Sequence, residues 1–311
     1  MKFSHVPIMK EQCMQLLDIK PDGIYADCTA GGGGHSAGIL ERLSEKGKLV
    51  CIDKDTEALD ACRERFKDDA RVTFIHSDYK AFADILDRLG IDKVDGILID
   101  LGISSYQIDN YERGFSYMSD DAPLDMRMDR TQSLDAAYVL NNYTEKQICD
   151  ILRYYGEESF AAAIAKEIVS MREKQPFVTC GQLVAVTDKV IPQSVRRKVG
   201  HSAKKTFQAL RIEVNKELEG LDTALHSMVD RLKSGGRIAV ITFHSLEDRI
   251  VKHCFADCQT DCICPPEFPV CVCNHRAVGK LVNKKPIVPD SSEIKVNSRS
   301  ASAKLRALEK L

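Results

Sequence analysis

The sequence predicts an α/β protein with a mostly parallel, doubly wound sheet and an inserted all-helical segment. In residues 24–101, short apolar stretches alternate with amphipathic helical patterns, as in parallel sheets covered by helices on both faces. The alternation stops in residues 134–209, where the pattern is helical throughout, and it returns afterwards. We therefore expect residues 1–109 and 206–311 to form the sheet domain, and residues 110–205 to form a loop and a helical insertion.

The first hundred residues alternate strictly between the two kinds of element. The helix expected after the second strand places Leu59, Cys62 and Phe66 on one face, with Asp55 or Thr56 as its cap. The expected strands are residues 23–30, 48–55, 72–78 and 94–102, and the expected helices are residues 35–47, 56–69 and 80–90.

The remaining two thirds predict a loop, a helical stretch and a second set of strands. Residues 102–130 are rich in Ser, Asp, Gly and Tyr, which predicts a long functional loop. A helix that ends at two glycines, residues 218–236, precedes a strong strand, residues 237–245. The helices expected in the insertion are residues 133–143, 144–156, 157–174 and 179–191, and the β-like stretches expected to add edge strands are residues 280–289 and 301–310.

Composition places the chain among globular proteins. The 311 residues are 44% hydrophobic, which is enough for a sizeable core. There is no apolar run long enough to span a membrane, and the N-terminal residues lack the charged-then-apolar order of a secretion signal. We expect a cytoplasmic protein with no membrane partner, and the sequence leaves a homodimer open.

Charge is close to balanced in total but not along the chain. The net charge is −2, yet residues 191–211 carry six Lys or Arg and no acid, and residues 270–311 carry nine against three acids. Such segments either attract phosphates or are simply solvated helix faces. The candidates for contact with a nucleic-acid backbone are Arg196, Arg197, Lys204 and Lys205.

Four consecutive glycines, residues 31–34, lie between the first strand and the first helix. Glycines at this point bring a ligand close to backbone N–H groups, and Gly32-x-Gly34-x-x-Ala37 satisfies a dinucleotide-binding fingerprint. Asp53 follows 19 residues after Gly34, where it could bind ribose hydroxyls. Both dinucleotides and S-adenosylmethionine use this arrangement. The alternatives of a dinucleotide-dependent oxidoreductase and a non-catalytic RNA-binding protein therefore stay open.

Other features favour S-adenosylmethionine. Asp27 precedes the glycines, Ser77-Asp78-Tyr79 follows the third strand, and a glycine-closed helix leads into the last strong strand. The segments GGGGHS, DLGISSYQID, GFSY, APLDMRMD, KTFQALRIEVNKEL, ITFHSLEDR and SAKLR follow in order over nearly the whole chain. In these motifs the chain resembles the RsmH (MraW) family of ribosomal RNA cytosine-N4 methyltransferases. The resemblance implies a class I S-adenosylmethionine-dependent fold and N4-methylation of a cytidine in the decoding centre (P-site region) of 16S rRNA.

The resemblance also implies a set of site residues. The expected cofactor contacts are Gly33, Gly34, His35, Asp53, Tyr79, Asp100 and Gln107. Amino methyltransferases commonly place a [DNS]-P-P-[YFW] motif after the fourth strand, and this chain has Asp100-Leu101-Gly102-Ile103 instead. Asp100 is therefore the candidate acceptor for the cytosine amine, or it only holds the methionine end of the cofactor. His244, after the last strong strand, either lines the substrate entrance or satisfies a backbone carbonyl.

Cysteines form a separate pattern. Six lie in apolar segments, where a free thiol behaves as a small hydrophobe, and six lie in residues 254–273. Cys262-x-Cys264 and Cys271-x-Cys273 flank a Pro-rich turn and could supply four thiolates to a structural zinc ion. The alternative is a set of reduced thiols in a surface loop.

Overall fold

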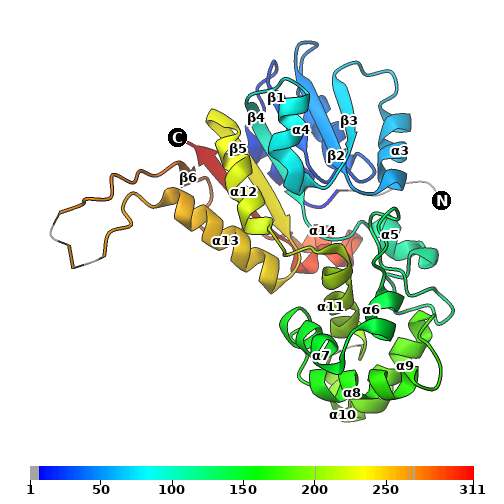
Figure 1. The fold of residues 1–311 in the computed structure, drawn as a ribbon. Helices are drawn as coiled ribbons and strands as arrows, with labels where there is room; N and C mark the ends of the chain where they lie inside the picture. The colour runs from blue at the N-terminus through cyan, green and yellow to red at the C-terminus, as the bar shows by residue number, and fades with distance from the viewer. Residues whose placement is uncertain (1–6, 200, 266, 269) are drawn as a thin grey trace. The chain divides into compact units, whose positions relative to one another are not determined.

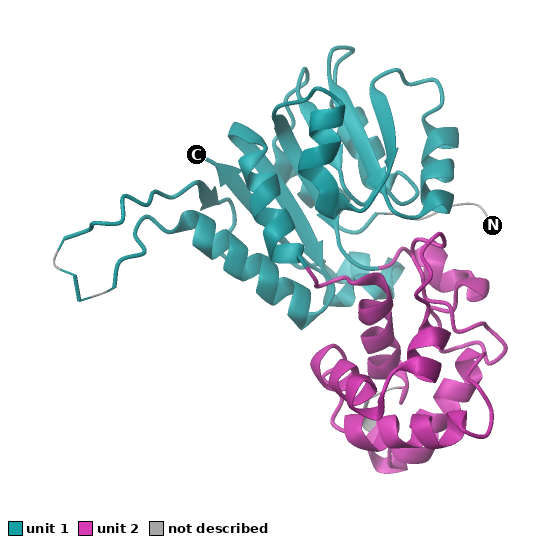
Figure 2. Cartoon of the chain, viewed as in Figure 1, with its two compact units in different colours: residues 1–102, 220–311 teal, residues 103–219 magenta. Residues whose placement is uncertain are grey.

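The chain folds into two compact units. The structure is a computed structural model that describes residues 7–199, 201–265, 267–268 and 270–311. A sheet unit comprises residues 1–102 and 220–311, and a helical unit comprises residues 103–219 (Figure 2). The sequence placed these boundaries at 109/110 and 205/206. Residues 1–6, which belong to the segment examined for a secretion signal, lie outside the described residues.

The sheet unit contains a seven-stranded sheet of order β3-β2-β1-β4-β5-β7-β6 (Figure 1). β1 to β5 are parallel, while β7 runs antiparallel to both β5 and β6. This confirms the α/β class with a mostly parallel sheet. The strands are β1 (Ile24–Asp27), β2 (Lys48–Asp53), β3 (Val72–His76), β4 (Val94–Asp100), β5 (Leu232–Thr242), β6 (Gly279–Leu281) and β7 (Lys304–Lys310).

Both faces of the sheet are covered by helices. Successive residues of a strand point to opposite faces, so Ile97 and Leu98 belong to different hydrophobic clusters. One cluster packs α4 (Phe82–Arg88), α12 (Leu221–Asp230) and α13 (Ser245–Gln259) against the sheet. The other packs α1 (Lys10–Leu17), α2 (Gly34–Leu40) and α3 (Thr56–Arg65). Burial on two faces is the reason that the central strands are almost continuously apolar.

Two expectations for the last third of the chain are corrected by the structure. α12 ends at Asp230, and β5 begins at Leu232, which pairs with Val94; Gly235 and Gly236 therefore lie within the strand instead of closing the helix. Of the two expected edge strands, only β6 lies at the sheet edge, because β7 inserts between it and β5. α1, α13 and α14 (Ser291–Val296) were not predicted.

The helical unit has its own core. Its cluster includes Ile148, Ile164 and Leu183, and also Phe207 and Leu210 from α11. α11 therefore packs with the helical unit, although the sequence assigned most of this segment to the sheet domain. The helices are α5 (Ser105–Asp109), η2 (Tyr111–Arg113), α6 (Ala136–Asn142), α7 (Glu145–Tyr154), α8 (Ala161–Arg172), α9 (Cys180–Val190), α10 (Gln193–Val199) and α11 (Lys204–Asn215).

The segment APLDMRMD, inside the expected long loop, is tightly held by hydrogen bonds. The Asn215 side chain at the end of α11 donates to Met126 O (2.7 Å) and accepts from Met128 N (2.7 Å). The buried Arg113 guanidinium donates to the carbonyls of Arg127 and Met128 (both 3.0 Å). Two of the sequence motifs, APLDMRMD and KTFQALRIEVN, thus bind each other, and the loop has a defined conformation.

No helix in the described part of the chain is long and apolar enough to cross a membrane.

Candidate functional site

Strand order reverses between β1 and β4. The chain continues from β1 to β2 on one side of this point and from β4 to β5 on the other, so the connections after these two neighbouring strands diverge. In parallel sheets this reversal leaves a crevice at the carboxyl ends of the strands, where ligands bind. β1 ends at Asp27 and β4 ends at Asp100, and the two strands pair in register through Asp27 and Leu98. Asp100 N donates to Thr29 Oγ1 (2.6 Å), which fixes the loop after β1 to the end of β4. Two carboxylates therefore flank the crevice.

Asp27 supports the beginning of α2. Ser36 Oγ donates to Asp27 Oδ2 (2.6 Å), the Ser36 backbone N–H also donates to the carboxylate, and Thr29 N donates to Oδ1 (3.3 Å). Complete burial raises the pKa of Asp27, while the charge of His35 and these hydrogen bonds act against the shift. Because its oxygens are already occupied by the chain, Asp27 orients the helix.

The Asp100 carboxylate has fewer hydrogen-bond partners than that of Asp27. Its Oδ1 is buried and has no hydrogen-bond partner among the described residues. Its Oδ2 lies 3.8 Å from His35 Nδ1, too far for a hydrogen bond. Burial raises the pKa of Asp100 to about 6; His35 lowers it, and the charges of Asp27 and Glu247 raise it further. An acceptor oxygen with no donor of its own is the arrangement expected where a ligand donates the hydrogen bond.

His35 connects this carboxylate to the N-terminal segment. Its Nε2 lies 2.9 Å from the Ile8 carbonyl oxygen, which can only accept, so Nε2 carries a proton and donates it to this hydrogen bond. Nδ1 is then directed to the side of Asp100. The buried ring touches the chain on both sides, and this makes His35 a support for Asp100 at least as much as a ligand contact.

Asp53 joins the glycine turn to the end of β2. Gly31 N donates to Asp53 Oδ2 (2.8 Å), and Asp55 N donates to Oδ1 (2.8 Å). Burial raises the pKa of Asp53 to about 6, although these two N–H groups lower it. The cap of α3 is Asp55, which accepts from Glu57 N (3.0 Å). Asp53 therefore accepts from the turn that precedes α3, while Asp55 caps the helix itself.

Neighbouring protein atoms explain why residues 33 and 34 are glycines. Gly33 has a φ of +74°, and a Cβ there would lie 2.6 Å from the Phe66 ring. A Cβ on Gly34 would lie 3.0 Å from Pro7. Both positions face protein atoms, so the fold itself requires residues without a side chain here. The turn presents only backbone to the crevice, as a cofactor that approaches closely would need.

The region after β3 is a short 3-10 helix, η1 (Tyr79–Ala81). Asp78 caps it by accepting from Lys80 N (2.9 Å). Tyr79 is only 9% exposed and belongs to the hydrophobic cluster that includes Ile52 and Phe82. Its ring packs mainly against the core.

Two other predicted site residues serve as helix caps. His244 Nδ1 accepts from Glu247 N (3.5 Å) at the start of α13, and Glu247 Oε2 accepts from Phe243 N (2.9 Å). Gln107 belongs to the helical unit, where its Oε1 accepts from Ser104 N (3.0 Å). The contact of His244 Nδ1 is therefore a helix cap, and it is neither of the two alternatives expected from the sequence. Its role in catalysis, and that of Gln107 in cofactor binding, stay predictions.

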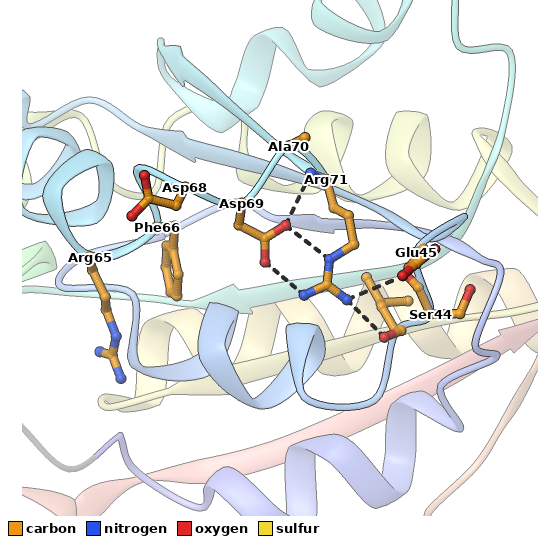
Figure 3. A pocket seen from close by; sticks show the side chains of 9 residues that line it. Ser44, Glu45, Arg65, Phe66, Asp68, Asp69, Ala70 and Arg71 are labelled. Atoms are coloured by element: carbon orange, nitrogen blue, oxygen red, sulfur yellow. Dashed lines mark hydrogen bonds and ion pairs between the residues drawn. The ribbon is translucent and has the colours of Figure 1, made fainter.

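An open pocket elsewhere on the sheet unit does not belong to this site. It lies at the amino ends of β2 and β3, where Arg71 spans its floor (Figure 3). The Arg71 guanidinium binds both oxygens of Asp69 and also the Leu43 carbonyl (2.8 Å). Its cation is thus used to hold the loops together, and ligands of parallel sheets bind at the opposite end of the strands.

Sequence reasoning selected Asp53 and Asp100 as candidates but did not predict the hydroxyl contacts beside the glycine turn. Ser36 donates to Asp27, and Thr29 accepts from the backbone of Asp100, a contact that depends on the pairing of β1 with β4. A signal existed for Glu247, because an acid three residues after His244 is the pattern of a capping box.

A family model and full-length relatives match this chain. Residues 2–311 match the MraW methylase family. "Ribosomal RNA small subunit methyltransferase H" of Clostridium botulinum is 52% identical over 311 residues, covering 100% of both chains. "Ribosomal RNA small subunit methyltransferase H 2" of Agathobacter rectalis is 50% identical, covering 100% of this chain and 99% of that one. Among solved structures, an rRNA methylase from Streptococcus thermophilus is 12% identical with a TM-score of 0.41, covering 97% of this chain and 93% of that one.

Proposed function

The chain belongs to the MraW methylase family, and we propose that it uses S-adenosylmethionine to methylate the N4 amine of a cytidine in the decoding centre (P-site region) of 16S rRNA. The names of its full-length relatives support a substrate in the small ribosomal subunit. The observation that carries the proposal is the buried Asp100 Oδ1, which has no hydrogen-bond partner among the described residues. We place this activity in the cytoplasm, where ribosomal subunits assemble.

The crevice at the ends of β1, β2 and β4 fits the cofactor. The turn at Gly33 and Gly34 has no side chains of its own, and Asp53 accepts from Gly31 N in the same turn, with each carboxylate oxygen able to accept a second hydrogen bond. We assign ribose binding to Asp53 and an adenine contact to Tyr79. We also assign cofactor contacts to His35 and Gln107. When bound, the cofactor supplies an electrophilic methyl group on a sulfonium sulfur.

We assign to Asp100 the activation of the cytosine amine. The N4 lone pair of cytosine is delocalised into the ring, so the amine is a poor nucleophile. A carboxylate that accepts a hydrogen bond from the amine increases electron density on nitrogen, and it also holds the amine in position. With a pKa of about 6, Asp100 is mostly ionised at pH 7.5 and can accept. The second candidate, His244, is assigned only a position near the substrate, because its Nδ1 is used to cap α13.

The helical unit is the proposed RNA-binding part. Of the four basic candidates, Arg196 pairs with Asp188 (3.0 Å) and Lys205 donates to the Glu157 carbonyl (2.8 Å). The other two, Arg197 and Lys204, are exposed. Those two have their charges available for phosphates, and a base that leaves its stack to react needs its flanking backbone held.

The test measures cofactor binding and methyl transfer separately. Small ribosomal subunits from cells lacking this chain are incubated with the full-length protein and S-adenosylmethionine carrying a labelled methyl group. We expect Asp100→Ala to lower transfer by at least about 100-fold. The matched control is Asp84→Ala, an exposed acid on α4, which should retain transfer. Turnover retained by Asp100→Ala would remove Asp100 from the mechanism.

Calorimetry with S-adenosylmethionine assigns the role of Asp100. An unchanged Kd in Asp100→Ala indicates that the carboxylate acts on the cytosine amine, while a Kd that rises with the loss of transfer indicates that it binds the methionine end. The same titration with NAD tests the oxidoreductase alternative. Cofactor binding without any methyl transfer to ribosomal RNA would support the non-catalytic RNA-binding protein instead.

A further inference from the structure

The connection between α13 and β6 is a long loop that leaves the body of the sheet unit (Figure 1). Its base is closed by two hydrogen bonds, from Val278 N to Cys258 O (2.9 Å) and from Ala277 N to Asp261 Oδ1 (3.1 Å). Beyond that base, no described residue between 259 and 278 belongs to a hydrophobic cluster. The apolar side chains of Ile263 and Val272 are exposed. Another interaction must therefore hold the two arms of the loop together.

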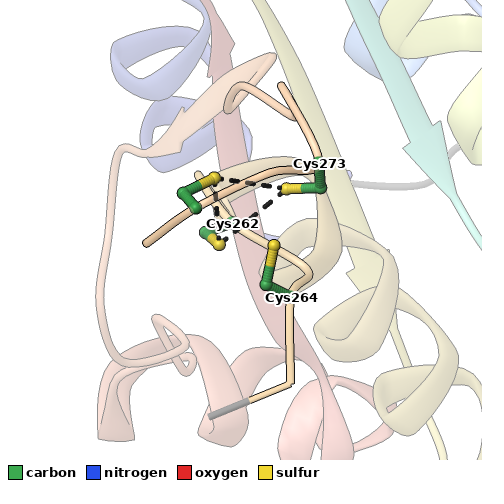
Figure 4. A group of neighbouring side chains, drawn as sticks. Cys262, Cys264 and Cys273 are labelled. Atoms are coloured by element: carbon green, nitrogen blue, oxygen red, sulfur yellow. Dashed lines mark hydrogen bonds between the residues drawn. The ribbon is translucent and has the colours of Figure 1, made fainter. Parts of the chain in front are cut away.

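Four cysteine side chains meet between those arms. Cys262 and Cys264 lie on the outgoing arm, and Cys271 and Cys273 lie on the returning arm. Figure 4 labels Cys262, Cys264 and Cys273. All four sulfur atoms lie within 4.8 Å of one another. The Cys262–Cys271, Cys271–Cys273 and Cys262–Cys273 sulfur pairs are 3.4, 3.5 and 3.8 Å apart. A tetrahedral zinc ion with bonds of about 2.3 Å requires sulfur pairs about 3.8 Å apart, so three thiols are already close to that spacing.

Backbone groups complete the surroundings of these sulfur atoms. Val272 N donates to Cys264 Sγ (3.3 Å), and the N–H groups of Ile263 and His275 donate to Cys273. Asn274, with a φ of +51°, provides the turn that brings His275 N back to Cys273. Donors of this kind stabilise negative charge on sulfur, and a set of thiolates that share one cation needs such donors.

We propose that Cys262, Cys264, Cys271 and Cys273 bind one structural zinc ion that clamps the two arms of this loop. The site goes beyond the proposed function, because methyl transfer to an amine requires no metal. Four protein ligands leave no open position, and this is typical of a structural ion. The consequence is a defined shape for a loop that has no core of its own.

Two alternatives to a zinc ion at the four loop cysteines can be distinguished from it by experiment. His226, Cys254 and Cys258 form a second cluster, in which Cys258 Sγ lies 3.7 Å from His226 Nδ1. This cluster has only three ligands, and Cys254 and Cys258 also pack in the hydrophobic core. Two disulfides among the four loop cysteines are the other possibility, and a disulfide would require sulfur atoms about 2.05 Å apart.

The test measures metal in the full-length chain, purified without an affinity tag that binds metal and without added zinc or chelator. We expect about one zinc ion per chain, and less than about a fifth of that in Cys271→Ser/Cys273→Ser. Two control variants should keep their zinc: Cys149→Ser, which changes a half-buried cysteine in the helical unit, and Cys258→Ala, which removes a ligand of the second cluster.

Two further measurements keep the test independent of how well the loop variant folds. Wild-type protein reconstituted with Co²⁺ should show thiolate-to-cobalt charge transfer and the visible bands of a tetrahedral site. Removing zinc with a chelator should speed tryptic cleavage at the exposed Arg276 by at least about tenfold. A metal-free chain with four reactive loop thiols, a mass that indicates two disulfides, or zinc that survives the loop variant and disappears in Cys258→Ala would each overturn the proposal.

Discussion

Replacing Asp100 by Asn should stabilise the chain in the absence of ligand while it impairs methyl transfer. Asp100 Oδ1 is buried without a partner, and Oδ2 lies beyond hydrogen-bond distance from His35. An amide of the same shape therefore loses no hydrogen bond that the carboxylate makes. It does remove a buried charge, which the chain tolerates at a cost in folding free energy.

The size of the stabilisation expected from Asp100→Asn follows from the raised pKa of Asp100. Burial raises the pKa of Asp100 from 3.8 to about 6, and each pKa unit corresponds to about 1.4 kcal/mol of difference between folded and unfolded states. The ionised carboxylate thus disfavours folding by at most about 3 kcal/mol. The side chain is 25% exposed, so water offsets part of this cost. We expect Asp100→Asn to raise the free energy of unfolding by about 1–3 kcal/mol at pH 7.5.

The sign of the pH dependence is fixed by the direction of the shift. A carboxyl with a raised folded-state pKa destabilises the fold fully above about pH 6, and the effect disappears as pH falls towards 3.8. The advantage of Asp100→Asn over wild type should therefore shrink between pH 7 and pH 4. Urea unfolding followed by far-UV circular dichroism measures it, since the chain has no tryptophan.

Asp95, at the other end of β4, provides the matched control. It accepts from Ile24 N (2.9 Å) and pairs with Lys233 (2.7 Å). Although burial acts to raise the pKa of Asp95, the Lys233 partner and the Ile24 N–H outweigh it and lower that pKa. Asp95→Asn should therefore destabilise the chain. If Asp100→Asn also destabilises it, or if its effect does not change with pH, the description of Asp100 as an unsatisfied buried carboxylate is wrong.

Three further predictions concern ligands and the turn. Because Asp53 and Asp100 both have a pKa of about 6, affinity for S-adenosylmethionine measured by calorimetry should fall about tenfold per required carboxylate between pH 7.5 and pH 5. Gly33→Ala combines a positive φ with a contact 2.6 Å from Phe66, and thermal unfolding should show a loss of about 2–4 kcal/mol. Arg197→Glu/Lys204→Glu should weaken binding to small-subunit RNA and reduce the salt slope by about 0.7 per lost phosphate contact.

Two of these have a control within the chain. Gly90 has a φ of +66° but nothing within 4 Å of an added Cβ, so Gly90→Ala should cost less than Gly33→Ala. Lys46→Glu/Lys93→Glu changes the net charge equally on exposed positions of the sheet unit and should leave the salt slope unchanged. Equal losses at the two glycines, equal salt slopes for the two charge variants, or an affinity independent of pH would contradict the respective prediction.

The central sheet was predictable because burial on both faces leaves a strong mark on the sequence. β2 and β4 are almost uninterrupted apolar runs, each ending at an acid, and these ends made Asp53 and Asp100 the candidates for the site. The beginning of β5 was missed because Gly235 and Gly236 resemble a helix end. In the structure they lie at an irregularity inside the strand, between Leu232 and Arg237, which both pair with β4. Local sequence cannot show that tertiary pairing overrides a glycine signal.

The buried cysteines of α13 and the contact between Thr29 and Asp100 show a second limit of sequence-based prediction. Cys254 and Cys258 were grouped with the loop cysteines, yet both are buried core positions of a 15-residue helix. Only burial distinguishes a cysteine that packs from one that is exposed near three others. Similarly, the contact of Thr29 with Asp100 N joins residues 71 positions apart. Such a contact depends on strand register, which the spacing of motifs does not reveal.

The central claim is that this chain methylates the N4 amine of a cytidine in the decoding centre of the small ribosomal subunit. The most direct measurement is mass spectrometry of 16S rRNA fragments and nucleosides, after small subunits from cells lacking the chain are incubated with the purified protein and S-adenosylmethionine. We predict one added methyl group, carried by the base of one decoding-centre cytidine, and none with Asp100→Ala. A methyl group on a ribose, on another base or on no nucleotide at all would contradict the claim.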